Sequence, residues 1–307
     1  MSLSEHCAEF AGLRVVDFTD ETPGPDLPPA ASVAWRIRVG WNESTSRYLE
    51  KFERFLERVD VSRVSALIIG YCGGGYELDK PVARLAAAAD RFPDLRALFV
   101  GEILAEEAEI SWIMQTDVTP LLAAFPLLER FEVRGGSELE LSPVKSTALR
   151  VLRMETGGLP REVVRAVGES DLPNLEHLEL WLGVAEYGGD ATVADLAPIL
   201  AGERLPSLRY LGLEDSEIQD EIATAVAGAP VVARLETLSL PMGTLGDEGA
   251  EALLSGQPLT HLKKLDLSHH FLSDEMTQRI RAALPGVEID LRGAQVEDEW
   301  RYVAVSE

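Results

Sequence analysis

The chain has 307 residues, of which 46% are hydrophobic and 26% are charged, an ordinary globular composition with ample apolar side chains for a core. Its 28 Lys and Arg residues against 52 Asp and Glu residues give a formal charge of −24, which argues against nucleic-acid binding and against an anionic membrane surface. A basic protein or peptide partner is electrostatically allowed, although acidity that only keeps the protein soluble is the simpler explanation.

Residues 1–60 are expected to form an N-terminal cap. They lack the basic and then apolar stretch of a signal peptide, and the chain has no apolar run long enough to cross a bilayer, so we expect a cytoplasmic protein. β-Branched and aromatic residues predict strands at 12–18 and 32–41, and apolar residues at helical spacing predict a helix at 42–59. Such a segment would cover the end of a repeat array, where the terminal repeat has no neighbour.

Residues 61–291 are expected to form that array, because a phrase of the form LxxLxL returns at intervals of 21 to 33 residues. Its copies are LRALFV from Leu95, LERFEV from Leu128, LRVLRM from Leu149, LEHLEL from Leu175, LRYLGL from Leu208, LETLSL from Leu235 and LKKLDL from Leu262, with a weaker VSALII from Val64 and a degraded VEIDL from Val287. Alternation within each phrase predicts a short strand whose leucines point to one side.

The segments after the strands are predicted to be helices. IQDEIATAVAGA, LGDEGAEALLSG and LSDEMTQRIRAAL align over their first halves, and Asp220, Asp247 and Asp274 are the expected N-caps. A strand, a turn and a full helix in about 27 residues lie within the known range of leucine-rich repeats. Residues 292–307 remain as a C-terminal tail.

The repeated phrase resembles the leucine-rich-repeat superfamily, and specifically its ribonuclease-inhibitor-like subclass with long helices. The resemblance implies an α/β solenoid, or horseshoe, with a parallel concave sheet, convex helices and, here, an N-terminal α/β cap. The chain departs from the family motif because the Asn or Cys position after the strands is never Asn, so no asparagine ladder is expected. The stretches EISWIMQTDVTPLLAAFP, LPNLEHLELWLGVAEYGGDATVADLAPIL and EDEWRYVAVSE also resemble a bacterial leucine-rich-repeat family found beside radical-SAM and ATP-grasp genes, which implies an accessory role beside biosynthetic enzymes.

The strand residues between the leucines are expected to face the concave surface and to bind a protein or peptide. Aromatic and Arg side chains are common interface anchors, and the middle repeats supply several. The expected binding residues are Phe99, Arg130, Glu132, Arg134, Arg153, Glu155, His177, Glu179, Trp181, Tyr210 and Glu214, with Tyr187 in the loop after Trp181. The alternative is that cross-strand pairs such as Arg153–Glu179 neutralise one another on a solvated face.

No motif for catalysis, for a metal or for a cofactor is found. His269 and His270 are adjacent without a third ligand at a recognisable spacing, so a structural role is favoured for His270. Cys72 is interpreted as a buried turn residue. The leading prediction is therefore a non-enzymatic binding scaffold. An accessory protein that presents a substrate to partner enzymes is one alternative, and an enzyme with a site between the cap and the first repeats, near Tyr71–Tyr76 and Trp112, is another.

Overall fold

The computed structural model describes residues 3–74, 77–296 and 300–307. The chain divides into two compact units. Unit 1 comprises Met1–Leu141, Ala148–Val151 and Glu307, and unit 2 comprises Ser142–Thr147 and Leu152–Ser306.

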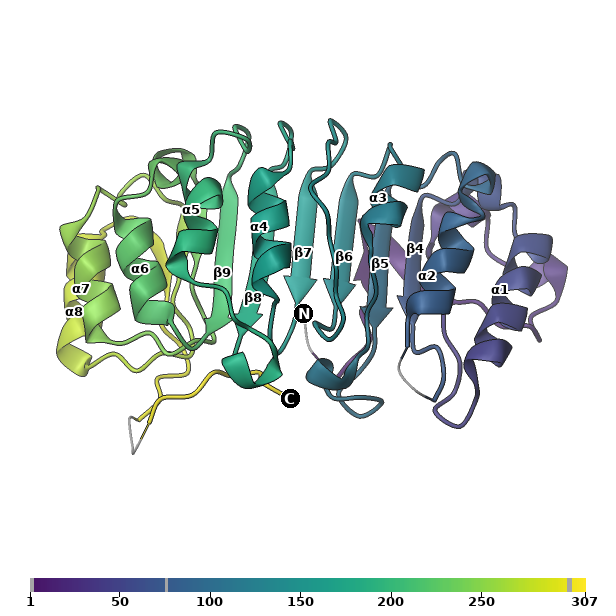
Figure 1. Cartoon of the computed structure of the whole chain (residues 1–307), viewed down its shortest axis with the longest axis horizontal. Helices are drawn as coiled ribbons and strands as arrows, with labels where there is room; N and C mark the ends of the chain where they lie inside the picture. Colours follow the sequence, from purple (N-terminus) through teal and green to yellow (C-terminus); the bar gives the residue numbers. More distant parts are fainter. Residues whose placement is uncertain (1–2, 75–76, 297–299) are drawn as a thin grey trace. The chain divides into compact units, whose positions relative to one another are not determined.

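Unit 1 alternates strands with helices (Figure 1). Strands β1 and β2 form an antiparallel hairpin, and β2 to β6 are parallel and pair in sequence order. The strands are β1 (Glu9–Phe10), β2 (Leu13–Asp17), β3 (Ala34–Ile37), β4 (Ala66–Gly70), β5 (Ala97–Glu102) and β6 (Arg130–Arg134), and the α-helices are α1 (Thr45–Arg58), α2 (Asp79–Ala86) and α3 (Thr119–Ala124). The region expected as a cap thus supplies β1, β2, β3 and α1.

The main core of unit 1 lies between its sheet and its helices. The strand register places Trp35, Leu67, Leu98 and Phe131 side by side on β3 to β6, and all four side chains are fully buried. The predicted apolar stripe of α1 is confirmed, because Tyr48, Phe52, Phe55 and Leu56 are its buried residues. Strand alternation therefore directs one set of side chains to the helices and the other set to the opposite face.

Unit 2 has the same alternation of strands and helices. Strands β8 to β12 are parallel and pair in sequence order. The strands are β7 (Val151–Glu155, of which Leu152 onward belongs to this unit), β8 (His177–Gly183), β9 (Tyr210–Ser216), β10 (Thr237–Ser239), β11 (Lys264–Asp266) and β12 (Glu288–Asp290). The α-helices are α4 (Arg161–Glu169), α5 (Val193–Ala201), α6 (Gln219–Ala227), α7 (Asp247–Ser255) and α8 (Asp274–Ala283).

The predicted leucine spine is confirmed in unit 2. Leu178, Leu211, Leu238, Leu265 and Ile289 are direct partners from β8 to β12. The four leucines are buried, and α5, α6, α7 and α8 pack against one another in the order of the sequence. Each repeat therefore buries its apolar side against its neighbours, as a repeat that cannot form a core alone must do.

The aspartates predicted as N-caps do not cap their own helices, because the N-caps of α6, α7 and α8 are Ile218, Gly246 and Ser273. Asp220 does not cap α6, which already begins at Gln219. Its Oδ1 accepts hydrogen bonds from the backbone N–H groups of Gly246 at 2.8 Å and Gly249 at 3.1 Å, at the start of α7. Asp247 Oδ1 likewise accepts the N–H of Ser273, the N-cap of α8, at 2.8 Å. Because helix starts are neighbours in stacked repeats, each carboxylate satisfies donors of the next helix.

The described part of the C-terminal tail runs along unit 2. The Ala304 N–H donates to the Met242 carbonyl at 2.7 Å, and the Val305 N–H donates to Asp215 Oδ1 at 3.0 Å. Asp215 is fully buried and has a φ of 56°, a left-handed conformation that is uncommon for a residue other than glycine. The tail is therefore fixed to the ends of β9 and β10.

Candidate functional site

The strand face opposite the helices, which we call the helix-free face, carries a polar network in unit 2. It is built by the side chains that alternate with the leucines, namely Arg153 and Glu155 on β7, His177, Glu179 and Trp181 on β8, Tyr210 and Glu214 on β9 and Ser239 on β10. The register pairs His177 with Tyr210, Glu179 with Gly212 and Trp181 with Glu214. Parallel strands thus bring most of the residues predicted in the middle repeats into one cluster.

His177 and Tyr210 are stacked at the edge of this network. Their ring centroids are 3.8 Å apart and their planes differ by 9°. Both residues are half-buried, so the pair presents a partly exposed aromatic surface on a rigid sheet. The Tyr210 hydroxyl donates to Glu214 Oε1 at 3.1 Å, and His177 Nε2 lies 3.2 Å from Glu179 Oε2. The aromatic pair is therefore tied to two carboxyl groups.

Glu179 is the most strongly engaged of these carboxylates. Its Oε1 accepts hydrogen bonds from Arg153 Nε at 2.6 Å and from Trp181 Nε1 at 3.1 Å, and its Oε2 faces His177. Burial alone would raise the pKa of Glu179, but the His177 hydrogen bond and the Arg153 charge outweigh burial and lower the pKa to about 2. Arg153 also forms an ion pair with Glu155, so the network holds one guanidinium between two carboxylates.

Glu214 has the opposite character. Burial and the charge of Glu179 raise the pKa of Glu214 to about 8, against the lowering effect of hydrogen bonds from Ser239 and Tyr210. Burial is also the main reason that the pKa of the Tyr210 hydroxyl lies above its ordinary value. Near neutral pH the protein therefore holds a protonated Glu214 beside an ionised Glu179.

Gly212 makes room for this carboxyl pair. It lies on β9 opposite Glu179, and a Cβ at this position would lie 2.6 Å from Glu214 Oε1 and 3.1 Å from Glu179 Cγ. Any side chain at position 212 would displace a carboxyl group. The sequence contains this glycine two residues before Glu214, but only the strand register shows that it also lies opposite Glu179.

The expectation that Trp181 is exposed on this face is wrong. Only 3% of the residue is exposed, because the Arg153 guanidinium carbon lies 5.6 Å from the centre of its ring and its indole N–H is bonded to Glu179. Arg153, Glu155, Glu179 and Glu214 are also buried. Side chains on adjacent parallel strands are so close that the larger ones cover one another. Of the residues predicted on β7, β8 and β9, His177 and Tyr210 are the ones left partly accessible.

The predicted residues of unit 1 are also mostly covered. Phe99 is fully buried, with Phe10 on one side and the Arg134 guanidinium 5.5 Å from its ring centre. Glu132 and Arg134 are buried, and Arg130, which is half-buried, forms an ion pair with Glu132. These residues do lie on the helix-free face, but they do not form an open aromatic and arginine surface.

Tyr187 lies in the loop between β8 and α5 and is half-buried. The following residue, Gly188, has a φ of 92°, which turns the chain toward α5. Gly158 approaches the Tyr187 backbone so closely that a Cβ at 158 would lie 2.3 Å from its carbonyl oxygen. The loop backbone is thus packed closely against Gly158, and a role of the Tyr187 ring in binding stays a prediction.

The residues named for an enzyme near the first repeats differ in exposure. Tyr71 is buried and its hydroxyl donates to the Trp41 carbonyl at 3.3 Å, whereas Trp112 is 58% exposed. Tyr76 lies outside the described residues. Among the carboxyl groups that the structure describes, those with raised pKa values are Glu214 and Asp215, both in unit 2.

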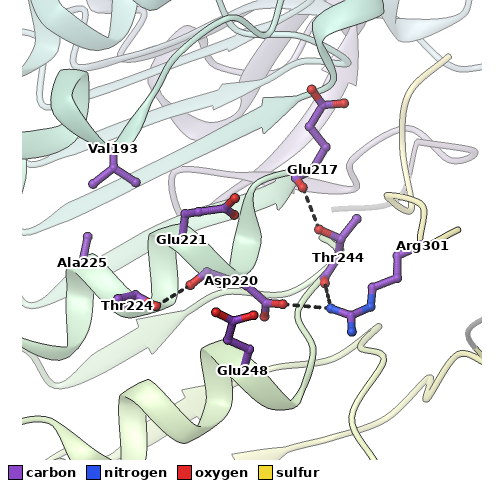
Figure 2. A pocket seen from close by; sticks show the side chains of 9 residues that line it. All are labelled: Val193, Glu217, Asp220, Glu221, Thr224, Ala225, Thr244, Glu248 and Arg301. Carbon is purple, nitrogen blue, oxygen red and sulfur yellow. Dashed lines mark hydrogen bonds and ion pairs between the residues drawn. The ribbon is translucent and has the colours of Figure 1, made fainter.

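A cavity of about 790 Å³ in unit 2 was not anticipated (Figure 2). Its acidic lining consists of Glu217, Asp220, Glu221 and Glu248, and its basic residue is Arg301 of the tail. Figure 2 shows Arg301 reaching Asp220, which it contacts at 2.8 Å, and the Thr244 carbonyl at 3.3 Å. The contact between Arg301 and Asp220 spans 81 residues, so no repeat pattern could have indicated it.

The structural roles predicted for His270 and Cys72 are confirmed. His270 is buried, with Nε2 3.1 Å from the Leu291 carbonyl and Nδ1 accepting the Leu272 N–H, and Cys72 Sγ bonds the Glu77 carbonyl at 3.0 Å. Among the residues that the structure describes, no cluster of three or more His, Cys, Asp or Glu could hold a metal ion. Within the same residues, every helix is too short or too polar to cross a bilayer.

Comparisons with known proteins agree with the repeat architecture. A family model described as Leucine Rich repeat matches residues 259–275. A crystal structure of a protein from Bacteroides fragilis has a TM-score of 0.81 and 30% sequence identity to this chain, and it aligns over 90% of this chain and 78% of that one. The chain belongs to the leucine-rich-repeat family. No curated protein shows a significant match. The predicted α/β leucine-rich-repeat fold class is therefore confirmed.

Proposed function

We propose that this leucine-rich-repeat chain is a non-enzymatic scaffold of the cytoplasm that binds a protein or peptide on the helix-free face of unit 2. The observation that supports this most directly is the stacked His177–Tyr210 pair, partly exposed above the carboxyl network. A flat aromatic surface on a rigid sheet offers contact area at a low cost in conformational entropy. The α-helices between the consecutive strands β7 to β12 of unit 2 support the ribonuclease-inhibitor-like subclass.

A basic group on the partner fits the chemistry of this face. The chain carries a formal charge of −24, and Glu214 holds a proton that a nearby cation would displace, because an opposite charge favours the ionised form. Binding of a Lys or Arg side chain beside Tyr210 would therefore release up to one proton near neutral pH. The partner's affinity would rise as the pH approaches 8.

The carboxyl pair supports binding over acid–base catalysis. Split pKa values in neighbouring carboxyl groups are typical of general acid and base pairs. Both oxygens of Glu179, however, are occupied by Arg153, Trp181 and His177. A general base needs an oxygen that can reach a substrate proton. The network therefore serves to hold the aromatic pair and to exchange one proton at Glu214.

The accessory role expected from the sequence resemblance is a narrower form of this proposal. In that form the partner is a biosynthetic enzyme or the peptide on which it acts. The accessory role requires no binding residues beyond those already named, because the helix-free face of unit 2 would present the bound segment to the enzyme.

Direct binding measurements test the proposal. The partner is first recovered by affinity capture and mass spectrometry and then titrated calorimetrically against the wild-type chain and the His177→Ala/Tyr210→Ala variant. We expect the double variant to lose tenfold or more in affinity, since central aromatic anchors typically contribute at least ~1.4 kcal/mol. The matched control is Glu203→Gln, an exposed change between α5 and β9.

The proton balance provides a second readout. Titration in two buffers with different ionisation enthalpies should show proton release by the wild-type chain and none by Glu214→Gln. Equal affinity of the double variant and the wild-type chain for every recovered partner would refute this assignment of the binding face.

A further inference from the structure

The helix-free face of unit 1 is occupied by the chain's own N-terminal segment, which we define as residues 3–10. At one end of the segment, the Leu3 carbonyl accepts the N–H of Ala105, just beyond β5, at 2.8 Å. At the other end, the ring centroids of Phe10 and of Phe99 on β5 are 6.1 Å apart. In Figure 1, part of the purple N-terminal chain passes behind the strands of unit 1, on the side away from the helices. The segment thus crosses the face that the repeat pattern displays.

An apolar seat receives Phe10. The seat is formed by Ala34, Ala66, Ile68, Ala97 and Phe99, which alternate with the core residues on β3, β4 and β5. Three of these five side chains are alanines on adjacent strands, and their small size leaves room for the Phe10 ring. Phe10 is only 2% exposed there, and the Arg130 guanidinium carbon lies 5.6 Å from its ring centre. The face can therefore bury one aromatic side chain almost completely.

A polar anchor lies beside the apolar seat. Glu102 is 1% exposed, and its carboxylate accepts the Cys7 backbone N–H at 2.9 Å, contacts His6 Nδ1 at 3.0 Å and accepts from Arg36 Nη1 at 3.1 Å. The register shift in β5 next to Gly101, with its φ of 85°, lets Glu102 project onto the helix-free face. Arg38 donates toward His6 Nε2 at 2.6 Å, so His6 Nε2 accepts and Nδ1 donates to Glu102.

The N-terminal segment combines an irregular stretch with a two-residue hairpin strand. Residues 3–8 form no regular secondary structure, and Ser4, Glu5, Ala8 and Glu9 are exposed. Glu9–Phe10 form β1, which pairs with β2, and the Ala8 carbonyl accepts the Val15 N–H at 2.8 Å. The segment joins β2 through a tight turn at Ala11 and Gly12, where Ala11 has a φ of 51°. A left-handed alanine is strained, and this strain would be relieved if the segment left its seat.

We propose that the helix-free face of unit 1 is a peptide-binding site and that residues 3–10 are its resident, exchangeable ligand. The partner is an extended segment with an aromatic side chain for the alanine-lined seat. Four residues before the aromatic, as His6 is before Phe10, it carries a hydrogen-bond donor for Glu102. This proposal rests on the proposed function of the helix-free face as a peptide-binding surface, and it names the residue pattern of the ligand and the way in which the site is kept closed.

A peptide with the chain's own sequence tests the proposal. The probe is a fluorescent synthetic peptide of residues 3–12 with Cys7→Ser, and binding to the full chain is followed by anisotropy. We expect Phe10→Ala in the protein to bind the probe at least tenfold more tightly than the wild-type chain does, because its own segment no longer competes. Glu9→Ala, an exposed neighbour, is the matched control and should behave like the wild-type chain. A probe that itself carries Phe10→Ala should not bind.

Two further variants guard against a folding failure. Ala11→Gly relieves the turn and should weaken probe binding relative to the wild-type chain, because the closed state becomes more favourable. His6→Ala removes one anchor at a half-buried position and should strengthen probe binding even if Phe10→Ala fails to fold. Equal probe affinity across the folded variants, or equal binding of the Phe10→Ala probe, would overturn the proposal.

Hydrogen exchange and size measurements separate the remaining outcomes. The Cys7 amide should exchange faster than the amides of β4 in the wild-type chain, and equal protection would mean that the segment is a permanent part of the core. A dimer that dissociates on addition of the probe would mean that copies exchange their segments, which would replace the partner peptide as the occupant. The His177→Ala/Tyr210→Ala variant should bind the probe like the wild-type chain, so failure here is distinguishable from failure of the proposed site in unit 2.

Discussion

Glu214→Gln should make the protein more stable at neutral pH and less sensitive to pH. In the folded chain the pKa of Glu214 is raised to about 8 by burial and by Glu179, whereas an exposed Glu titrates near ~4.3. The folded state therefore binds more protons than the unfolded state between these values. Stability from this group is present below about pH 4 and is lost as the pH rises toward 8.

The size of this stability loss follows from the difference between the folded and unfolded pKa values of Glu214. Each pH unit within it costs up to ~1.4 kcal/mol for one proton, so the wild-type chain should lose roughly 3 kcal/mol between pH 5 and pH 7 through Glu214. Glutamine has the shape of the protonated acid, and its carbonyl oxygen can still accept the Tyr210 hydroxyl hydrogen bond. The variant should therefore keep the fold and avoid this loss.

Urea unfolding followed by circular dichroism at pH 5, 6, 7 and 8 is the measurement. Asp215 also has a pKa raised to about 8, mainly by burial, so both proteins should lose some stability as the pH rises. The difference between the two proteins isolates Glu214 and should grow with pH. Parallel profiles with a constant offset would refute the reasoning, because they would mean that Glu214 titrates alike in both states.

Three other predictions concern different parts of unit 2. Gly212→Ala should lower the free energy of unfolding by about 1–3 kcal/mol, because the new methyl group displaces Glu214 or Glu179, and an unchanged melting temperature would contradict the close contact. Asp220→Ala removes the cap of α7 and the ion-pair partner of Arg301, so we expect a loss of about 1 kcal/mol and faster tryptic cleavage after Arg301. An unchanged cleavage rate would show that the Asp220 contact does not protect this part of the tail. Tyr187→Ala should weaken partner binding in calorimetry without changing the melting temperature, whereas a lower melting temperature with full affinity would make the ring structural.

The repeated leucine pattern is what made the strands and the spine predictable. Leu178, Leu211, Leu238 and Leu265 occupy the same place in each phrase, and identical local patterns fold alike and stack in register. Within the regular phrases, the side of the sheet on which each residue lies followed from alternation. Alternation could not predict how much of each side chain is exposed to solvent. Trp181 is on the expected face, yet Arg153 and Glu179 cover it.

The features that sequence reasoning missed depend on contacts between residues far apart in the chain. Glu102 meets Cys7 across 95 residues, and Arg301 meets Asp220 across 81. No periodic pattern specifies such pairs. The cap prediction failed for a related reason, because a periodic Asp indicates a helix start but not which helix start receives its carboxylate. A glycine at the end of β5 was a local sign that Glu102 would leave the regular alternation.

The long reach of the N-terminal segment sets an order of events during synthesis. Cys7 emerges from the ribosome 95 residues before Glu102, the group that binds it. At about 5–20 residues per second, that delay is roughly 5 to 20 seconds. Neighbouring strands can pair as each repeat is completed, whereas the segment must wait until β5 has been made. Each nascent molecule therefore passes through a period, before the segment docks beside β5, in which this segment is accessible to chaperones and proteases.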